Sequence, residues 1–462
     1  SRLLSEGRSL IMGVMPRLSS LLVLSIAVFL AASVPILDEE SYLAITTQFD
    51  LLRPYHWWRP WPPWYGGTEP DAFVYAHPPL FLAWVAVVQD WAEGIRPVRL
   101  LASVPPAALL GWSAGRLLQG VTRRPMLGLA LWLSSPIVVL GLQRGLMPDL
   151  LVAALCTTSV LGWRERNNRT MAVIGGLALG LAAFTKYPAL MMVLVFLIHG
   201  WRTNGLKGSS AFWAAAAVPW LLGQAWLTVV YGRIHLVEVL TRASEISRGT
   251  GEGRALALLV RLSLGMTVLG FFVRGQRWLW GLSLAGASAV VMWGWPEDVI
   301  LSARLLVGAF ALAGALLMVL IAQGLVRSWT GGGDRLLMAL WAGAVLGTVW
   351  TTHNFAAPRY MLAAIFPLAV LVVMEVGERY SARTLLWIGV AIQGVLALGI
   401  TVTEHRFFEA GADLARASVA QFNPTHYTGE WSFRHEMDRA GVEFFTGDAP
   451  SGSVIAAPTH SS

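Results

Sequence analysis

The sequence has little cysteine and little charge. Cys156 is the single cysteine in 462 residues, which excludes a disulfide framework and a cysteine-based metal site. Charged residues make up 13% of the chain, where soluble domains carry about 25%. The chain also lacks a glycine-rich nucleotide loop, a His-Glu-x-x-His motif, a Gly-x-Ser-x-Gly motif and a dinucleotide-binding fingerprint. These absences argue against nucleotide chemistry on a soluble domain.

Hydrophobic residues are in excess, at 55% of the chain, and the mean hydropathy is +0.58. Apolar runs long enough to cross a bilayer recur along the sequence, which predicts an all-α polytopic membrane protein. The formal charge of +7 would suggest a nucleic-acid partner in a soluble chain. Here the basic residues lie in short loops between apolar runs. Orientation in a membrane explains that placement, so we expect membrane lipid and no nucleic acid as partner.

Three adjacent acids follow the first apolar run. From Leu18 to Leu37 there is no charge over about twenty residues, enough for one helical span. The run is too long for a cleaved signal peptide, so we interpret it as a retained span. Asp38, Glu39 and Glu40 therefore lie at a membrane surface, where costly charges indicate a functional site. They are also compatible with the simple exit of a helix from the lipid.

The basic loops predict the topology. The apolar segment 80–91 is short for a span, and we place it at the interface. The basic loops then share one side with the basic N-terminus, which makes that side cytoplasmic and gives about thirteen spans. Counting 80–91 as a span would separate the loops from the N-terminus. The predicted spans are 18–37, 98–118, 126–143, 149–163, 171–184, 188–200, 211–231, 255–273, 278–295, 304–325, 336–352, 359–376 and 384–401.

This topology divides the chain into a transmembrane domain, 1–401, and an extracytoplasmic segment, 402–462. The first outer loop, 38–97, contains a Trp- and Pro-rich stretch that suits the headgroup layer. The acidic cluster faces outward. Because the chain lacks an initiator Met and its tail completes no pattern, we expect a fragment of a longer protein.

Further ionisable residues share the predicted outer side. Each has a structural interpretation: Asp149 follows Pro148 at a helix N-terminus, Lys186 can reach the interface, and Arg359 can anchor a span. Taken together, cations at one depth can hold a lipid phosphate through charge-assisted hydrogen bonds. A nearby carboxylate can act as general base for an incoming hydroxyl. The candidate cations and their neighbours are Lys186, Arg359, Tyr360, Arg144 and His77.

The order of these motifs resembles the GT-C fold glycosyltransferases of the protein-mannosyltransferase and lipid A aminoarabinose-transferase type. The resemblance covers 18 to about 400 and includes the span count. The motifs are Asp38-Glu39-Glu40-Ser41-Tyr42-Leu43-Ala44-Ile45, His77-Pro78-Pro79-Leu80, Met147-Pro148-Asp149, Thr185-Lys186-Tyr187-Pro188 and Pro358-Arg359-Tyr360.

The resemblance implies an inverting transferase in the plasma (inner) membrane. It would move a sugar from a polyprenyl phosphate to a hydroxyl on a protein, glycolipid or cell-envelope glycan outside the cytoplasm. Asp38 would be the catalytic base, Glu39 its acidic neighbour, and Asp149 the acid of the second outer loop. Lys186 and Arg359 would contact the donor phosphate. His77 departs from the Lys of the aminoarabinose branch, and a His is only partly charged at neutral pH.

Other interpretations stay open at this stage. A transporter or lipid flippase would place ionisable groups near the bilayer midplane, where this chain has almost none. A scaffolding protein would not bring Asp38, Asp149, Lys186 and Arg359 into one cavity. No cofactor is certain and no metal ligand is assigned. A divalent metal ion at Asp38, Glu39 and Asp149 is an open alternative, because carboxylates bind hard cations.

Overall fold

The computed structural model describes most of the chain, and all structural statements below concern that part. Asp38, Glu39, His77 and the predicted span 278–295 lie outside it. The described residues are 2–31, 42–43, 46–47, 49–50, 52–55, 78–92, 94–246, 251–266, 301–352, 358–375, 380–429, 431–445 and 450–458.

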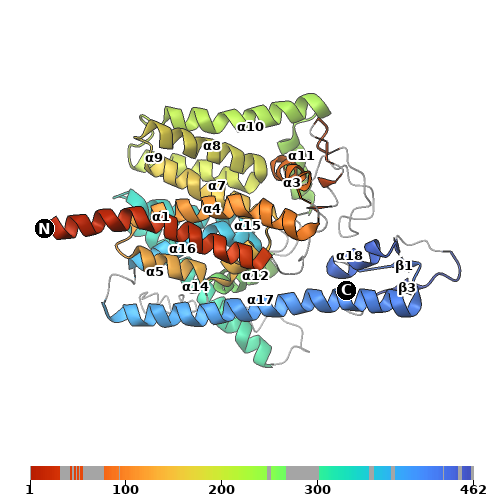
Figure 1. The fold of residues 1–462 in the computed structure, drawn as a ribbon. Coiled ribbons are helices and arrows are strands. Elements are labelled where there is room, and N and C mark those ends of the chain that lie inside the picture. The colour runs from red at the N-terminus through yellow and green to blue at the C-terminus, as the bar shows by residue number, and fades with distance from the viewer. Residues whose placement is uncertain are drawn as a thin grey trace.

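The molecule is a bundle of helices with a small piece at one end (Figure 1). The helices are α1 (Arg2–Ala31), α3 (Leu80–Gln89), α4 (Ile95–Val121), α5 (Pro125–Leu133), α6 (Pro136–Gln143), α7 (Pro148–Arg164), α8 (Arg169–Thr185), α9 (Met191–Arg202), α10 (Ser210–Tyr231), α11 (His235–Ile246), α12 (Gly251–Met266), α14 (Leu301–Ser328), α15 (Gly333–Thr352), α16 (Leu362–Glu375), α17 (Tyr380–Phe422) and α18 (Trp431–Arg439). Two 3₁₀ turns, η3 (Tyr187–Leu190) and η5 (Pro358–Met361), precede α9 and α16.

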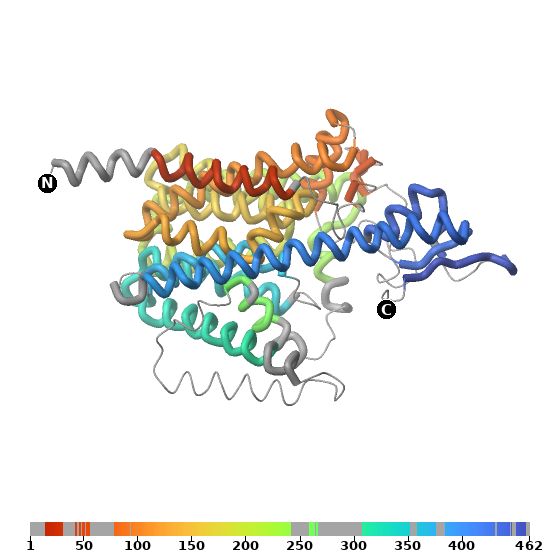
Figure 2. The backbone as a smooth tube through the Cα atoms, turned by 60° about the horizontal axis from the view of Figure 1, so that its bottom comes forward, coloured from red at the N-terminus to blue at the C-terminus, as the bar shows by residue number. Residues whose placement is uncertain are grey.

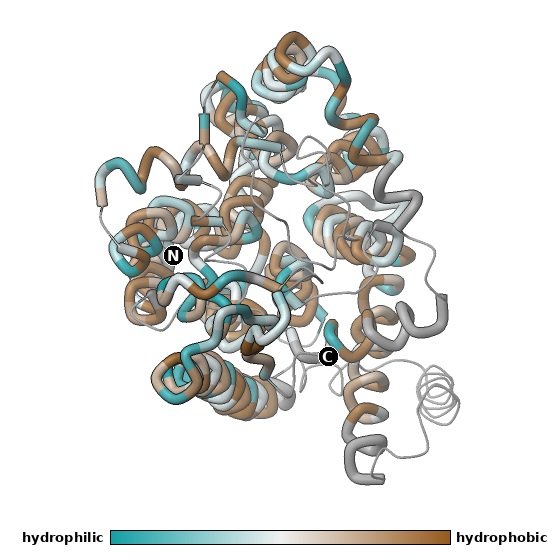
Figure 3. The backbone as a smooth tube through the Cα atoms, turned by 90° about the vertical axis from the view of Figure 1, so that its right-hand side faces the viewer, coloured by the Kyte–Doolittle hydropathy of each residue, from teal (hydrophilic) through white to brown (hydrophobic). Residues whose placement is uncertain are grey.

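The prediction of an all-α polytopic membrane protein is confirmed. Four described helices are long and apolar enough to span a membrane, or five if the bent pair α5 and α6 is one span. Viewed from the end that carries α18, the helices are mainly hydrophobic (Figure 3). The count of about thirteen spans stays a prediction.

The predicted span 126–143 is two helices rather than one. They meet at an angle of 64°. Pro136 opens α6, and a proline both lacks the N–H that a continuous helix needs and disfavours helical backbone in the residue before it. The bend therefore has a local cause in the sequence.

The N-terminus and the C-terminal segment mark the two ends of the bundle (Figures 1 and 2). At the N-terminal end, ion pairs join loops far apart in sequence, such as Arg164 to Asp334 at 2.8 Å and Arg116 to Glu165 at 2.9 Å. The loops predicted to share one side of the membrane therefore meet at one end of the molecule.

Glycines let the helices that carry the site approach closely. A Cβ on Gly176 of α8 would lie 2.1 Å from the backbone oxygen of Phe212 in α10. A Cβ on Gly162 of α7 would lie 2.4 Å from Cα of Gly175 in α8. Small residues at helix contacts are the usual way to pack membrane helices. The start of α7 and the end of α8 are thereby held side by side.

The C-terminal segment begins inside a helix. α17 runs without a break from Tyr380 to Phe422, across the predicted boundary between residues 401 and 402. Beyond it, β1 (His426–Tyr427) pairs in parallel with β2 (Glu443–Phe444) and β3 (Ile455–Ala456), in the order β2-β1-β3. α18 packs against α17, and Tyr427, Phe433 and Met437 form a small buried cluster of their own.

Candidate active site at the ends of α7, α8 and η5

Three elements bring an acid and two cations together. Asp149 is the second residue of α7, directly after Pro148 at the first helical position. Lys186 ends α8 in an extended conformation, and Arg359 lies in η5. Lys186 Nζ donates to Asp149 Oδ1 at 2.7 Å, and Arg359 Nε lies 3.9 Å from Asp149 Oδ2. One carboxylate is therefore shared by two cations.

The cluster is almost completely shielded from solvent. The side chains of Lys186, Asp149 and Arg359 are 6%, 10% and 16% exposed. Tyr360 forms one wall: Lys186 Nζ lies 4.4 Å from its ring centroid, and the Arg359 guanidinium carbon lies at 5.2 Å. Cations over an aromatic face are stabilised by its negative electrostatic potential. Charges in such surroundings interact more strongly than in water.

A small cavity adjoins the cluster. Its volume is about 50 Å³, and Asp149, Lys186, Arg359 and Tyr360 line it. The rest of its wall is mostly apolar, with residues from α7, α9, α15 and α16 that include Val152, Met192, Val345, Val349 and Leu362. A charged head beside an apolar wall suits an amphipathic ligand. A cavity of this size holds only small groups, so a sugar-bearing ligand must widen it.

Arg261 is a further cation that the sequence analysis did not select. It lies on α12, which packs against η5, and its guanidinium lies near the Tyr360 side chain. Its Nη1 is buried and has no hydrogen-bond partner among the described residues. The signal was present in the sequence: an arginine inside an apolar run indicates function, because its burial is costly. Among the described residues, Lys186, Arg359 and Arg261 are therefore three cations in the same region as Asp149, and a bound anion could contact them.

Lys186 is held by the residue that follows it. Gln224 of α10 donates to the Tyr187 hydroxyl at 2.9 Å, and that hydroxyl hydrogen-bonds His235 Nδ1 of α11. Tyr55 of the first outer loop stacks on the His235 ring, with centroids 5.0 Å apart. Burial raises the pKa of the Tyr55 phenol well above its usual value, so this side chain stays neutral. The network ties the backbone at Lys186 to α10, α11 and the outer loop.

The other predicted residues have different positions. Arg144 forms an ion pair with Glu404 of α17 and does not line the cavity. Its side chain is 7% exposed, so it acts as a buried link between α6 and α17. Asp38, Glu39 and His77 lie outside the described residues. α1 packs along α4, where Ser19 Oγ donates to the Gly111 oxygen at 2.7 Å.

A metal ion does not fit Asp149 as it stands. Among the described residues, no group of three or more His, Cys, Asp or Glu is placed to hold a metal. Both carboxylate oxygens of Asp149 already face cations, which a metal ion would have to displace. We therefore assign no metal ligand in this part of the chain.

No protein-family model and no curated protein matches the sequence. Several solved structures are similar to the chain, and three of them are described here. ArnT from Cupriavidus metallidurans in the apo state has a TM-score of 0.42 and 14% identity, and the match covers 93% of this chain and 84% of that one. ArnT bound to undecaprenyl phosphate has a TM-score of 0.43 and 15% identity, covering 96% and 89%.

The third is the Archaeoglobus fulgidus oligosaccharyltransferase in complex with Zn and sulfate. Its TM-score is 0.46 and its identity 13%, and the match covers 93% of this chain and 58% of that chain. Each match extends over nearly all of this chain. At such TM-scores and identities we rest no argument about activity on these similarities, and the interpretation of the site depends on its own geometry.

Proposed function

We propose that the protein is a membrane glycosyltransferase of the GT-C type. It transfers a sugar from a polyprenyl phosphate to a hydroxyl acceptor on the extracytoplasmic face. The observation that supports this most directly is that two nearly buried cations, Lys186 and Arg359, line one cavity beside an apolar wall, at the end of the bundle opposite the basic loops. A prenyl phosphate matches both the cations and the apolar wall. Its phosphate would bind the cations, and its hydrocarbon chain would contact the apolar wall.

In this proposal Lys186 and Arg359, which line the cavity, bind the donor phosphate, and Arg261 is a further cation nearby on α12. Arginine can bind phosphate through two parallel hydrogen bonds, whereas lysine acts as a point charge. Asp149 holds Lys186 and Arg359 in position. With both of its oxygens engaged by cations, Asp149 is poorly placed to accept a proton from the acceptor hydroxyl.

The general base is then Asp38, as the motif resemblance implies, with Glu39 beside it. The acceptor oxygen attacks the anomeric carbon while the bond from that carbon to the phosphate oxygen breaks. The hydroxyl proton passes to the Asp38 carboxylate. The phosphate leaves with the bonding electrons, and the buried cations stabilise the charge that develops on it. A single displacement of this kind inverts the anomeric carbon.

Reconstitution tests the proposal. Wild-type protein in proteoliposomes is given undecaprenyl phosphate carrying one radiolabelled sugar from a panel, together with an envelope extract as acceptor. We expect label to move to an acceptor with at least one sugar. Asp38→Asn should abolish transfer while donor binding and thermal stability stay close to wild type. Transfer by Asp38→Asn would remove that residue as the base.

The alternative of a lipid flippase predicts a different result in the same vesicles. The lipid-linked sugar would change leaflet and the sugar–phosphate bond would stay intact. Movement of the donor without sugar transfer, for every sugar in the panel, would overturn the transferase proposal. Mass spectrometry of envelope glycans from a deletion strain then identifies the acceptor class: protein, glycolipid or glycan.

A further inference from the structure

A second basic region lies at the opposite end of the bundle. The loop after α7 and the start of α10 enclose an open groove of about 590 Å³. Its lining combines two arginines with small and polar residues: Arg166, Asn167, Arg169, Gly208, Ser210, Ala211 and Ala214. α7 and α8 run between this groove and the candidate active site, so the two regions are separated by the length of those helices, about 25 Å at 1.5 Å per residue.

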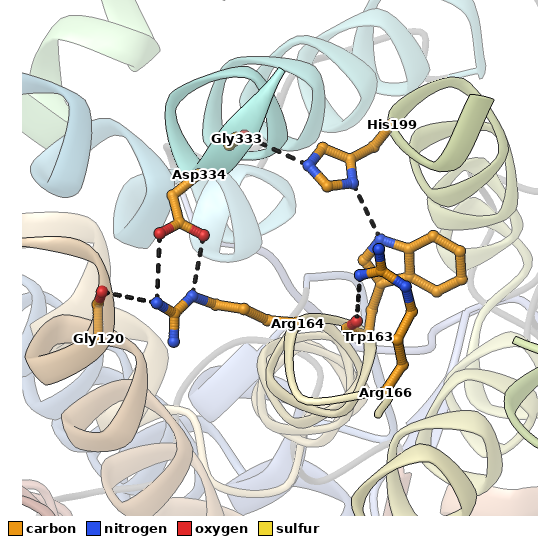
Figure 4. A network of polar contacts seen from close by, with 7 residues as sticks. All are labelled: Gly120, Trp163, Arg164, Arg166, His199, Gly333 and Asp334. Carbon is orange, nitrogen blue, oxygen red and sulfur yellow. Dashed lines mark hydrogen bonds and ion pairs between the residues drawn. The ribbon is translucent and has the colours of Figure 1, made fainter. Parts of the chain in front are cut away.

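Three described acids at this end, Glu165, Asp334 and Glu375, form ion pairs with other arginines. Arg164 reaches Asp334, whereas Arg166 turns over the Trp163 ring (Figure 4). Glu165 pairs with Arg116, and Glu375 pairs with Arg327 and Arg335 at 2.9 and 3.1 Å. Within the described residues, no carboxylate forms an ion pair with Arg166 or Arg169. Among the residues that the structure describes, no carboxylate therefore balances the positive charge of the groove.

Two hydrogen bonds hold the Arg166 guanidinium in place, and its Nη2 stays available to a ligand. Its Nε donates to the Gly205 oxygen at 3.1 Å and its Nη1 to the Trp163 oxygen at 3.0 Å. Its Nη2 makes no hydrogen bond to a described residue. Ser209 forms no side-chain cap on α10, so the first-turn N–H groups at Ser210 and Ala211 add partial positive charge to the same groove.

Further along α10 from the groove, the exposed surface of the helix becomes apolar. Residues 210, 214, 218 and 222 recur every four positions and so share one face of the helix. Ser210 and Ala214 are exposed at the groove, and Val218 and Leu222 are 52% and 65% exposed further along. Only 22% of the most apolar window of α10 is buried within the protein, so most of this helix is left uncovered and can contact lipid.

We propose that this groove binds the headgroup of an anionic phospholipid, with an acyl chain lying along the exposed face of α10. The headgroup phosphate accepts from Arg166 Nη2, Arg169 and the first turn of α10. The apolar residues Val218 and Leu222 contact the chain. A cationic groove next to an exposed apolar helix face matches a lipid, which has both a phosphate and an acyl chain. A soluble anion would contact the groove alone.

Native mass spectrometry tests the site on the full-length protein in detergent. Phosphatidylglycerol and phosphatidylcholine of equal chain length are added at equal concentration, and bound lipid is counted. We expect wild type to retain phosphatidylglycerol preferentially. Arg169→Gln should reduce that retention about fivefold, the order expected for one arginine near a charged lipid. Ser210→Glu should reduce it further, because it adds a negative charge in the groove while suiting a helix N-terminus.

Arg123→Gln is the matched control, because it removes the same charge from an exposed site at the same end of the bundle, outside the groove. It should leave retention unchanged. Equal retention of the two lipids by wild type, or an equal loss in Arg123→Gln and Arg169→Gln, would overturn the proposal. Complete displacement of the lipid by millimolar inorganic phosphate would also overturn it, since a soluble anion would then be the ligand.

Discussion

Lys186 and Lys207 are the two lysines of the chain, and their surroundings are opposite. Lys186 is buried between Asp149 and Tyr360, whereas Lys207 is exposed at the other end of the bundle. If Lys186 binds the donor phosphate, Lys186→Met should raise the KM for lipid donor at least about tenfold, the order of one charge-assisted hydrogen bond. The kcat should change less.

Steady-state kinetics in proteoliposomes measure this effect. Lys207→Met is the control, because it makes the same substitution at a residue remote from the cavity. An unchanged donor KM in Lys186→Met, or an equal rise in both variants, would remove Lys186 from the phosphate site.

We expect Asp149 to contribute more to the free energy of unfolding than either Lys186 or Arg359 does. Asp149→Asn removes the carboxylate that the nearly buried Lys186 and Arg359 share, which we expect to destabilise the protein by about 3 kcal/mol. The measurement is the thermal unfolding midpoint in detergent. Adding Lys186→Met to Asp149→Asn should recover part of the loss, since the cation in direct contact with Asp149 is then removed as well.

A surface ion pair supplies the comparison. Asp413 is 74% exposed and lies 2.6 Å from Arg416, so Asp413→Asn should cost less than about 1 kcal/mol. Equal shifts in Asp149→Asn and Asp413→Asn would mean that the Asp149 pair is no stronger than an exposed one.

At the scale of elements, η3 connects the site to α10 and α11. The Tyr187 hydroxyl accepts a hydrogen bond from Gln224 and forms another with His235. Tyr187 is 6% exposed. Tyr187→Phe leaves the Gln224 amide without this acceptor in a buried position, which should cost about 1 to 2 kcal/mol. It should also raise the donor KM, because the backbone at Lys186 loses an anchor.

Tyr427→Phe is the matched variant, since it removes a 2.6 Å hydrogen bond to Asp438 in the C-terminal segment. It should lower stability without changing the donor KM. If Tyr187→Phe behaves in the same way, η3 has a structural role only.

At the scale of the molecule, the two ends of the bundle should face opposite sides of the membrane. Cys156, the single cysteine, is 2% exposed and should give little background labelling. Lys207 and Ser451 are both exposed, at the basic end and in the C-terminal segment. We expect an impermeant maleimide to label Ser451→Cys on intact cells, and Lys207→Cys only after permeabilisation. The reverse pattern would invert the predicted topology.

Part of the architecture could be predicted because it depends on local chemistry. Apolar runs form helices in a bilayer, and the alternation of basic loops predicted which loops share one end. The same alternation predicted that Asp149, Lys186 and Arg359 share one side of the membrane, which is compatible with their meeting in one cluster. Prolines at 125, 136 and 148 mark the starts of α5, α6 and α7. The bend between α5 and α6 was missed, although Pro136 indicates it.

The partners of the charged groups were decided only by the tertiary structure. Arg144 shares the predicted outer side with the site, yet it pairs with Glu404 far along the chain. Arg261 lay within a predicted span, and only the packing of α12 on η5 brings it to Tyr360. Sequence determines that a residue is charged and roughly how deep it lies in the membrane. Helix packing determines which face it occupies and which opposite charge it meets, because these contacts join residues far apart in the chain.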